Sequence, residues 1–194
     1  MARPRSEDKR QALLKAATET FASEGLSAPT SLIARRAGVA EGTLFLYFPN
    51  KDTLFGAVFE HVLAELATCL TLGYDATASL KARTRLLWDN YVNWGIEHPA
   101  AYAAMNQLSV SGKLTPEQLD AANKLCADVG YQQEPIHFAG LNTEQSTEFS
   151  DALLTAVTNA TIGYMTSHPT AAEAYRGAGF EFLWRAIGPE EQCS

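Results

Sequence analysis

The sequence predicts an all-α fold of about nine helices, divided between a small N-terminal domain and a larger C-terminal helical domain. Apolar residues recur three and four positions apart along most of the 194-residue chain, and the alternating pattern of half-buried strands is nearly absent. Glycine and proline interrupt the periodic segments at intervals that match helix lengths. With 46% hydrophobic residues the chain can bury a sizeable core, so we expect a folded protein.

The N-terminal helices are delimited by residues that begin or end helices. Gly25 is suited to a left-handed stop after the first helix, and Gly38 to the same role after the second. Thr30 is expected to cap the second helix and Asn50 the fourth. Pro49 ends the third helix. We predict helices over about residues 6–24, 30–37, 41–48 and 51–72.

The C-terminal helices are longer. The pair His98-Pro99 breaks the first of them from the next. Capping boxes are expected at Thr115 to Gln118 and at Thr170 to Glu173, while residues 132–141 form a loop. We predict helices over about residues 78–97, 99–111, 116–131, 142–167 and 170–187.

Charge is distributed unevenly along the chain. The formal net charge is -7, but residues 1–50 hold seven basic and five acidic side chains, a balance of +2. The remainder therefore carries -9. A mildly basic N-terminal part attached to an acidic body suits a nucleic-acid-binding domain joined to a part that does not bind nucleic acid.

Several classes of protein are disfavoured. No stretch approaches the roughly 20 apolar residues of a membrane span and the N-terminus lacks a signal-peptide run, so we expect a cytoplasmic protein. Three widely spaced cysteines, Cys69, Cys126 and Cys193, suggest neither a disulfide framework nor a metal site. The histidines lack metal-ligand spacing, and no cofactor is implied. An enzyme is the competing class, but nucleophile elbows, phosphate-binding glycine loops and paired-carboxylate motifs are missing.

The second and third predicted helices form a helix-turn-helix pattern behind a longer supporting helix. Residues 37–40 join them, with Gly38 where the chain must turn sharply. Ala34 lies where close packing demands a small residue, and Val39 can fill the space between the helices. This pattern predicts DNA binding.

The residues around this turn add a more specific signal. Residues 38–55, GVAEGTLFLYFPNKDTLF, closely resemble the signature of the tetracycline-repressor (TetR) family, and the resemblance extends over about residues 9–58. It implies a DNA-binding domain at 1–50, a connecting helix at 51–72, and a regulatory and dimerisation domain at 73–194. It also implies a transcriptional regulator, expected to be a repressor that a small, largely apolar effector releases from a palindromic operator.

A recognition helix over residues 41–48 would enter the major groove with its N-terminal end first. Thr43 is expected to bond a base edge or a phosphate, and Leu44 to contact a thymine methyl group. The resemblance places Tyr47 and Lys51 at phosphates of the DNA backbone. The residues that this helix presents to DNA are Glu41, Gly42, Thr43, Leu44 and Tyr47.

Further DNA contacts are expected outside this helix. Thr30 and Ser31, which open the second helix, match backbone or base contacts of the family. Arg3 and Arg5 could form a flexible arm in an adjacent groove.

Glu41 departs from the family, which commonly has Lys, Arg, Ser or Pro at this position. A carboxylate is repelled by phosphates, but it could accept a hydrogen bond from cytosine N4 or favour the helix N-terminus. Ala40 leaves the same helix without a capping hydroxyl. Aromatic residues at helical spacing usually form core, so Phe45, Phe48 and Phe55 are excluded from the site.

The C-terminal domain is expected to dimerise, because two-fold DNA sites need a dimeric reader. A monomeric core would use similar apolar stripes. The residues chosen for the interface are Phe149, Leu153, Val157, Ala160, Tyr164, Tyr175, Phe182 and Leu183.

Aromatic and polar side chains of the middle helices could line an effector pocket or form plain core. These are Trp88, Tyr91, Trp94, Tyr102, Met105 and Gln107. The alternative is a ligand-independent regulator that acts through a protein partner.

Overall fold

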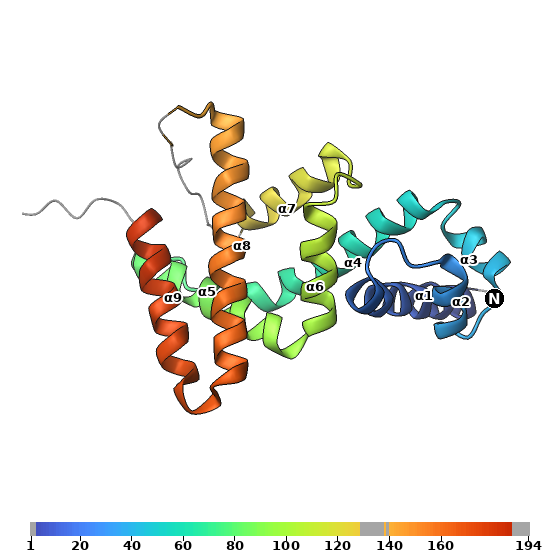
Figure 1. Cartoon of the computed structure of the whole chain (residues 1–194), viewed down its shortest axis with the longest axis horizontal. Helices are drawn as coiled ribbons and strands as arrows, with labels where there is room; N and C mark the ends of the chain where they lie inside the picture. Colours follow the sequence, from blue (N-terminus) through green and yellow to red (C-terminus); the bar gives the residue numbers. More distant parts are fainter. Residues whose placement is uncertain (1–2, 129–137, 139, 188–194) are drawn as a thin grey trace, which may run out of the picture. The chain divides into compact units, whose positions relative to one another are not determined.

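The computed structural model describes residues 3–128, 138 and 140–187. Within those residues it has nine α-helices, one short 3-10 helix and no strand, which confirms the all-α prediction (Figure 1). The helices are α1 (Arg3–Glu24), α2 (Thr30–Arg36), α3 (Glu41–Tyr47), α4 (Lys51–Leu70), α5 (Leu80–Glu97), α6 (Pro99–Ser109), α7 (Pro116–Asp128), α8 (Thr143–Ser167), the 3-10 helix η1 (Pro169–Ala171) and α9 (Ala172–Ile187).

Most helix ends lie within a few residues of the predicted positions. Gly25 and Gly38 have φ angles of 80° and 70°, the left-handed conformation that glycine adopts without strain. The Asn50 side chain accepts a 2.8 Å hydrogen bond from the Thr53 N–H and so caps α4. In the capping box of α7, the Thr115 N–H donates to Gln118 Oε1 at 3.0 Å.

Three local predictions were wrong. Thr30 does not cap α2, because Pro29 occupies the N-cap and Thr30 is already the first helical residue. Thr170 lies inside η1, so the turn before α9 is made by a 3-10 helix. The first helix begins at Arg3, so the backbone of Arg3 and Arg5 belongs to α1 and not to a flexible arm that precedes it.

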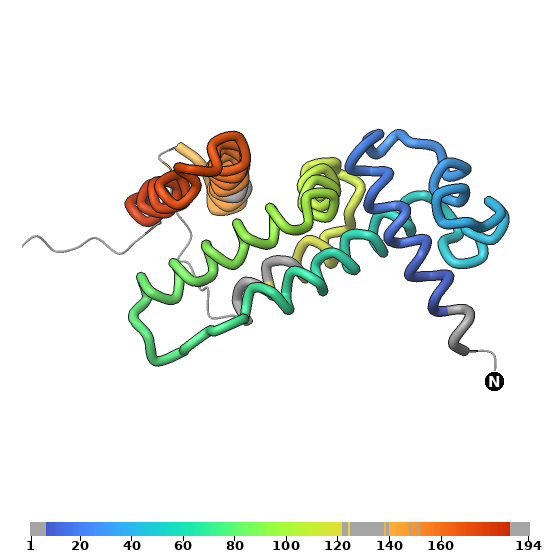
Figure 2. Tube along the Cα trace, turned by 90° about the horizontal axis from the view of Figure 1, so that it is seen from below, coloured from blue at the N-terminus to red at the C-terminus, as the bar shows by residue number. Residues whose placement is uncertain are grey.

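The chain packs into two compact units, and neither is a continuous stretch of sequence. Unit 1 comprises Met1–Thr68 and His98–Leu125, and unit 2 comprises Cys69–Glu97 and Cys126–Ser194. These units differ from the predicted division at residues 50 and 72, because α6 returns to pack against α1 (Figure 2). Sequence periodicity defines the apolar face of α6 but does not say which helix covers it.

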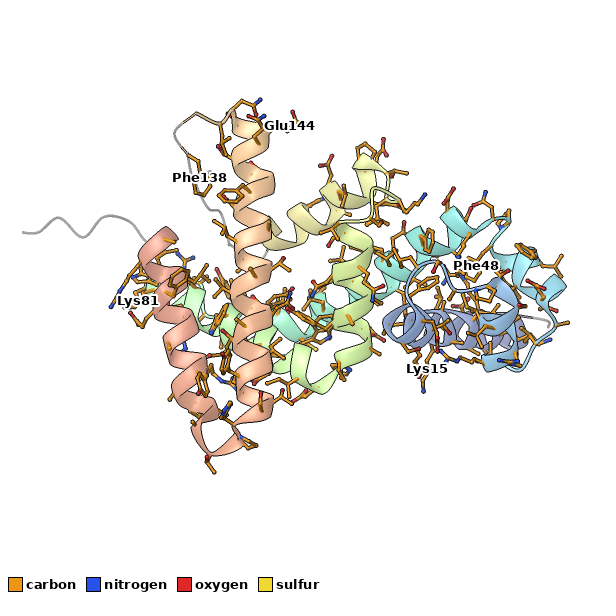
Figure 3. All side chains as sticks on the ribbon, viewed as in Figure 1. Lys15, Phe48, Lys81, Phe138 and Glu144 are labelled. Atoms are coloured by element: carbon orange, nitrogen blue, oxygen red, sulfur yellow. The ribbon has the colours of Figure 1, made fainter. Side chains whose placement is uncertain are left out.

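The core of unit 1 is built from helices α1 to α4 and α6. Phe21 and Phe55 are both buried, with ring centroids 5.2 Å apart. Phe48, which Figure 3 labels among the N-terminal helices, is 2% exposed. Helix α4 is long and apolar enough to cross a membrane by length and composition, but half of the segment is buried in the fold. Core helices of soluble proteins share these features.

The core of unit 2 joins α5 to the neighbouring helices α8 and α9. Trp88 and Phe180 lie in one buried cluster with Met165, and the Trp88 indole N–H donates to the Arg176 carbonyl at 3.1 Å. Gly179 allows close packing here, because a Cβ at this position would lie 2.8 Å from the Trp88 ring. The fold therefore fixes α8 and α9 against α5.

Candidate DNA-binding site

Helices α2 and α3 are joined by a tight turn. The Ala37 N–H donates to the Ile33 carbonyl at 2.9 Å, and the Val39 N–H donates to the Ala34 carbonyl at 3.0 Å. Ile33 and Ala34 are buried, as is Leu44 of α3. These contacts fix α3 against α2 in a helix-turn-helix arrangement.

The two sides of α3 have opposite environments. Leu44 is fully buried, whereas Leu46 is 83% exposed and Phe45 is 42% exposed. Residues four apart share a helix face, so Gly42 and Leu46 lie together on the side opposite Leu44. The centre of the outward face is therefore a glycine and a leucine.

This arrangement corrects two predictions. Leu44 was expected to touch a thymine methyl group, but its side chain is 0% exposed and is part of the core. Phe45 was assigned to the core, but it is 42% exposed. Phe48 and Phe55 are buried at 2% and 3% exposure, as predicted. The sequence does contain a signal for the buried face of α3. Leu44 and Phe48 are apolar and four residues apart, a spacing that places both on one side of a helix.

Glu41 and Thr30 are joined at the N-terminal ends of the two helices. The Thr30 hydroxyl donates to Glu41 Oε1 at 2.7 Å. This bond holds the carboxylate against α2, while Ser31 beside Thr30 is exposed. The structure thus accounts for the acidic residue at the start of α3 by a partner within the protein.

Lys51 is fixed by two neighbours at the start of α4. Its ammonium group donates to the Ala28 carbonyl at 2.7 Å and lies 5.7 Å from the centroid of the Phe55 ring. Burial lowers the pKa of the Lys51 side chain below its ordinary value. An ammonium group has three donors, and among the described residues one of them is bonded to the Ala28 carbonyl, which leaves two that can bind an anion.

Four other predicted contact residues, Thr43, Tyr47, Arg3 and Arg5, remain to be placed. Thr43 and Tyr47 are half-buried, and the Tyr47 ring lies 6.4 Å from that of Phe48. The side chains of Arg3 and Arg5 lie outside the described residues. Arg36, which was not a predicted contact, binds to side chains of α1. It donates hydrogen bonds to Thr20 and Ser23 and forms a 3.2 Å ion pair with Glu24.

Comparison with known proteins adds to this geometry. Residues 13–58 match the family described as bacterial regulatory proteins, tetR family. A solved structure from Shewanella sp. PV-4, assigned to the same family, superimposes with a TM-score of 0.72 and 27% identity over 92% of this chain and 97% of its own. Residues 13–58 thus carry the DNA-binding domain of the TetR family, and the described residues share the fold of a solved TetR-family structure. Members of this family are regulatory DNA-binding proteins and not enzymes.

Curated relatives match part of the chain. A helix-turn-helix transcriptional regulator from Haemophilus influenzae is 30% identical over 101 residues, which are 52% of this chain and 54% of the relative. The regulator YhgD from Bacillus subtilis is 39% identical over 60 residues, 30% of this chain and 31% of its own length. The matches thus span about half the length of these relatives or less.

The predicted effector residues fall in both units. Trp88, Tyr91 and Trp94 belong to unit 2, where the rings of Tyr91 and Trp94 are stacked 6.2 Å apart. Tyr102, Met105 and Gln107 lie on α6 in unit 1. Trp88, Trp94, Tyr102 and Met105 are all at most 8% exposed. Burial raises the pKa of the Tyr102 hydroxyl, and Trp88 is part of the unit 2 core.

The predicted interface residues separate into two groups. Phe149, Leu153, Tyr164 and Phe182 are between 42% and 65% exposed, and Ala160 is also exposed. Leu183 is 8% exposed and belongs to the unit 2 core, against which Val157 and Tyr175 also pack. These three side chains pack within a single chain. The candidate dimer surface is therefore formed by the exposed group.

Replacing Lys51 with methionine tests its contact with phosphate. We expect the plot of log affinity against log salt to flatten by about one unit, because one phosphate contact is lost. The melting temperature should also fall, since the bond to the Ala28 carbonyl is removed. The measurement is DNA binding at several salt concentrations. The control is Lys15→Met, because Lys15 is an exposed lysine on α1 (Figure 3). An unchanged slope for Lys51→Met would show that Lys51 does not touch phosphate.

Proposed function

We propose that this TetR-family protein is a sequence-specific DNA-binding regulator that acts in the cytoplasm as a repressor. The observation that carries this proposal is the exposed face of α3, held outward by a buried Leu44 on the opposite side. A helix presented in this way fits the major groove of B-DNA. Family membership supports the same function.

The proposed DNA contacts follow from accessibility. Thr43 faces base edges from the flank of α3, and Gly42 allows the helix backbone to come close to the groove. Tyr47 and Lys51 bind phosphates, which fix the position of the helix without reading sequence. Contacts from Thr30, Ser31 and Glu41 are proposed at the N-terminal end, where Thr30 and Glu41 share one hydrogen bond.

We further propose that the protein binds its operator as a homodimer. The exposed apolar side chains on α8 and α9, Phe149, Leu153, Tyr164 and Phe182, supply a surface that a second copy can bury. Pairing of α8 and α9 from two chains would make a four-helix interface with two-fold symmetry. Such a dimer matches a palindromic operator.

A small, largely apolar effector is proposed to release the operator. Support comes from the aromatic side chains of α5, where Tyr91 and Trp94 are stacked. The alternative is a ligand-independent regulator with a protein partner. Thermal shifts against a panel of apolar metabolites separate the two, since saturable stabilisation supports a sensor and failure of every compound supports the partner. An effector that releases DNA must, by reciprocity, bind less tightly in the presence of saturating operator.

Selection of genomic DNA fragments by the full-length protein tests the proposed function. A regulator should enrich a small set of fragments that share a two-fold sequence, and it should bind them about 10³-fold or more tightly than random DNA. Enrichment equal to that of random fragments would contradict sequence-specific regulation. Genes beside the enriched fragments would then indicate the class of effector.

A further inference from the structure

The outward face of α3 carries unusually accessible apolar side chains. At 83%, Leu46 has the largest exposed fraction among the large apolar residues that the structure describes, and its neighbour Phe45 is 42% exposed. Single exposed apolar residues are common on protein surfaces. Two in succession on a seven-residue helix that faces DNA call for a functional explanation.

Hydrogen-bonding side chains are scarce at the centre of the same face. Gly42 has no side chain, and Glu41 is bonded to the Thr30 hydroxyl at 2.7 Å. Tyr47 is half-buried beside Phe48. Thr43 offers a hydroxyl from one flank only. The middle of the face must therefore recognise bases mainly by apolar contact.

Gly42 strengthens this argument because it lies one turn before Leu46. A Cβ built at Gly42 would meet no protein atom within 4 Å, so internal packing does not require glycine there. The missing side chain instead lowers the surface of α3 and lets its backbone come closer to a groove. Leu46 is then the large apolar side chain with the greatest exposure on this face.

We propose that Leu46, assisted by Phe45, reads thymine in the operator by packing on its C5 methyl group. Among the four standard bases only thymine presents an apolar group in the major groove, so an alkyl side chain there selects thymine. This inference rests on the proposed DNA binding and adds the chemistry of recognition. Burial of one methyl group corresponds to about a fourfold gain in affinity.

The test removes the methyl group and the side chain separately. Full-length protein first selects duplexes from a random-sequence pool, and the tightest duplex is resynthesised with deoxyuridine in place of each thymidine in turn. At one or more thymidines of each half-site, wild type should lose about fourfold in affinity. Leu46→Ala should bind the thymidine duplex correspondingly less tightly and should not distinguish thymidine from deoxyuridine there.

The control is Leu72→Ala, which removes a leucine that is 64% exposed in unit 2. This variant should lose the same affinity as wild type when deoxyuridine replaces thymidine. Binding of Leu46→Ala to random duplexes should equal that of wild type. Equal binding of thymidine and deoxyuridine duplexes by wild type, or an undiminished penalty in Leu46→Ala, would overturn the inference while leaving DNA binding intact. Failure to enrich any duplex would overturn the proposed function and this inference together.

Discussion

Leu44→Ala should destabilise the protein by about 2–5 kcal/mol, the cost of removing a buried leucine side chain and leaving a cavity. Leu44 is fully buried on the inner face of α3, and α3 packs against α2. The cavity would loosen the helix that the proposed function places in the major groove. Specific and non-specific DNA binding should therefore weaken together.

Urea unfolding followed by circular dichroism measures this effect, and Leu46→Ala on the same helix is the matched control. The control should change stability by no more than about 0.5 kcal/mol, because an exposed side chain leaves no cavity. If Leu44→Ala kept wild-type stability and lost only sequence discrimination, Leu44 would be a base-reading residue after all.

Phe182→Glu is expected to weaken the proposed dimer by about 100-fold or more. Phe182 is 65% exposed, so the substitution leaves the core of unit 2 unchanged. In a two-fold interface each substitution occurs twice, and each would place an unpaired carboxylate against apolar surface. Operator affinity should fall in parallel, because a monomer can occupy only one half-site.

Analytical ultracentrifugation at micromolar protein concentration measures the effect. Val110→Glu is the control, because Val110 is 80% exposed and belongs to unit 1, whereas the proposed interface is formed by α8 and α9 of unit 2. A wild-type protein that sediments as a monomer, or a Phe182→Glu variant that remains a dimer, would refute the interface on α8 and α9.

Local sequence signals predicted the helices well because their causes are local. Gly25 and Gly38 adopt the left-handed conformation that their positions suggested, and Asn50 caps α4. Thr30 shows that local signals do not predict contacts between helices. Its hydroxyl bonds to Glu41, eleven residues away, in preference to a cap, and only the packing of α2 on α3 brings the two side chains together.

Side-chain orientation was harder to predict than secondary structure. Helix α3 has only seven residues, too few for its apolar pattern to define one face clearly. Each residue turns the helix by about 100°, so an error of one position can move a side chain from the buried to the exposed side. This is why Leu44 and Phe45 were assigned to the wrong sides. On α8 and α9 apolar residues occupy both an inner and an outer face, and apolarity alone does not distinguish Leu183 from Phe182.

Hydroxyl-radical footprinting of the full-length protein on a selected duplex tests the central claim most directly, that paired α3 helices read a two-fold DNA site. We expect two protected stretches on one face of the duplex, related by two-fold sequence symmetry and centred about one helical turn, roughly 10 base pairs, apart. Leu46→Ala should weaken both stretches equally. Protection of a single stretch, or protection that is the same on random DNA, would contradict the account.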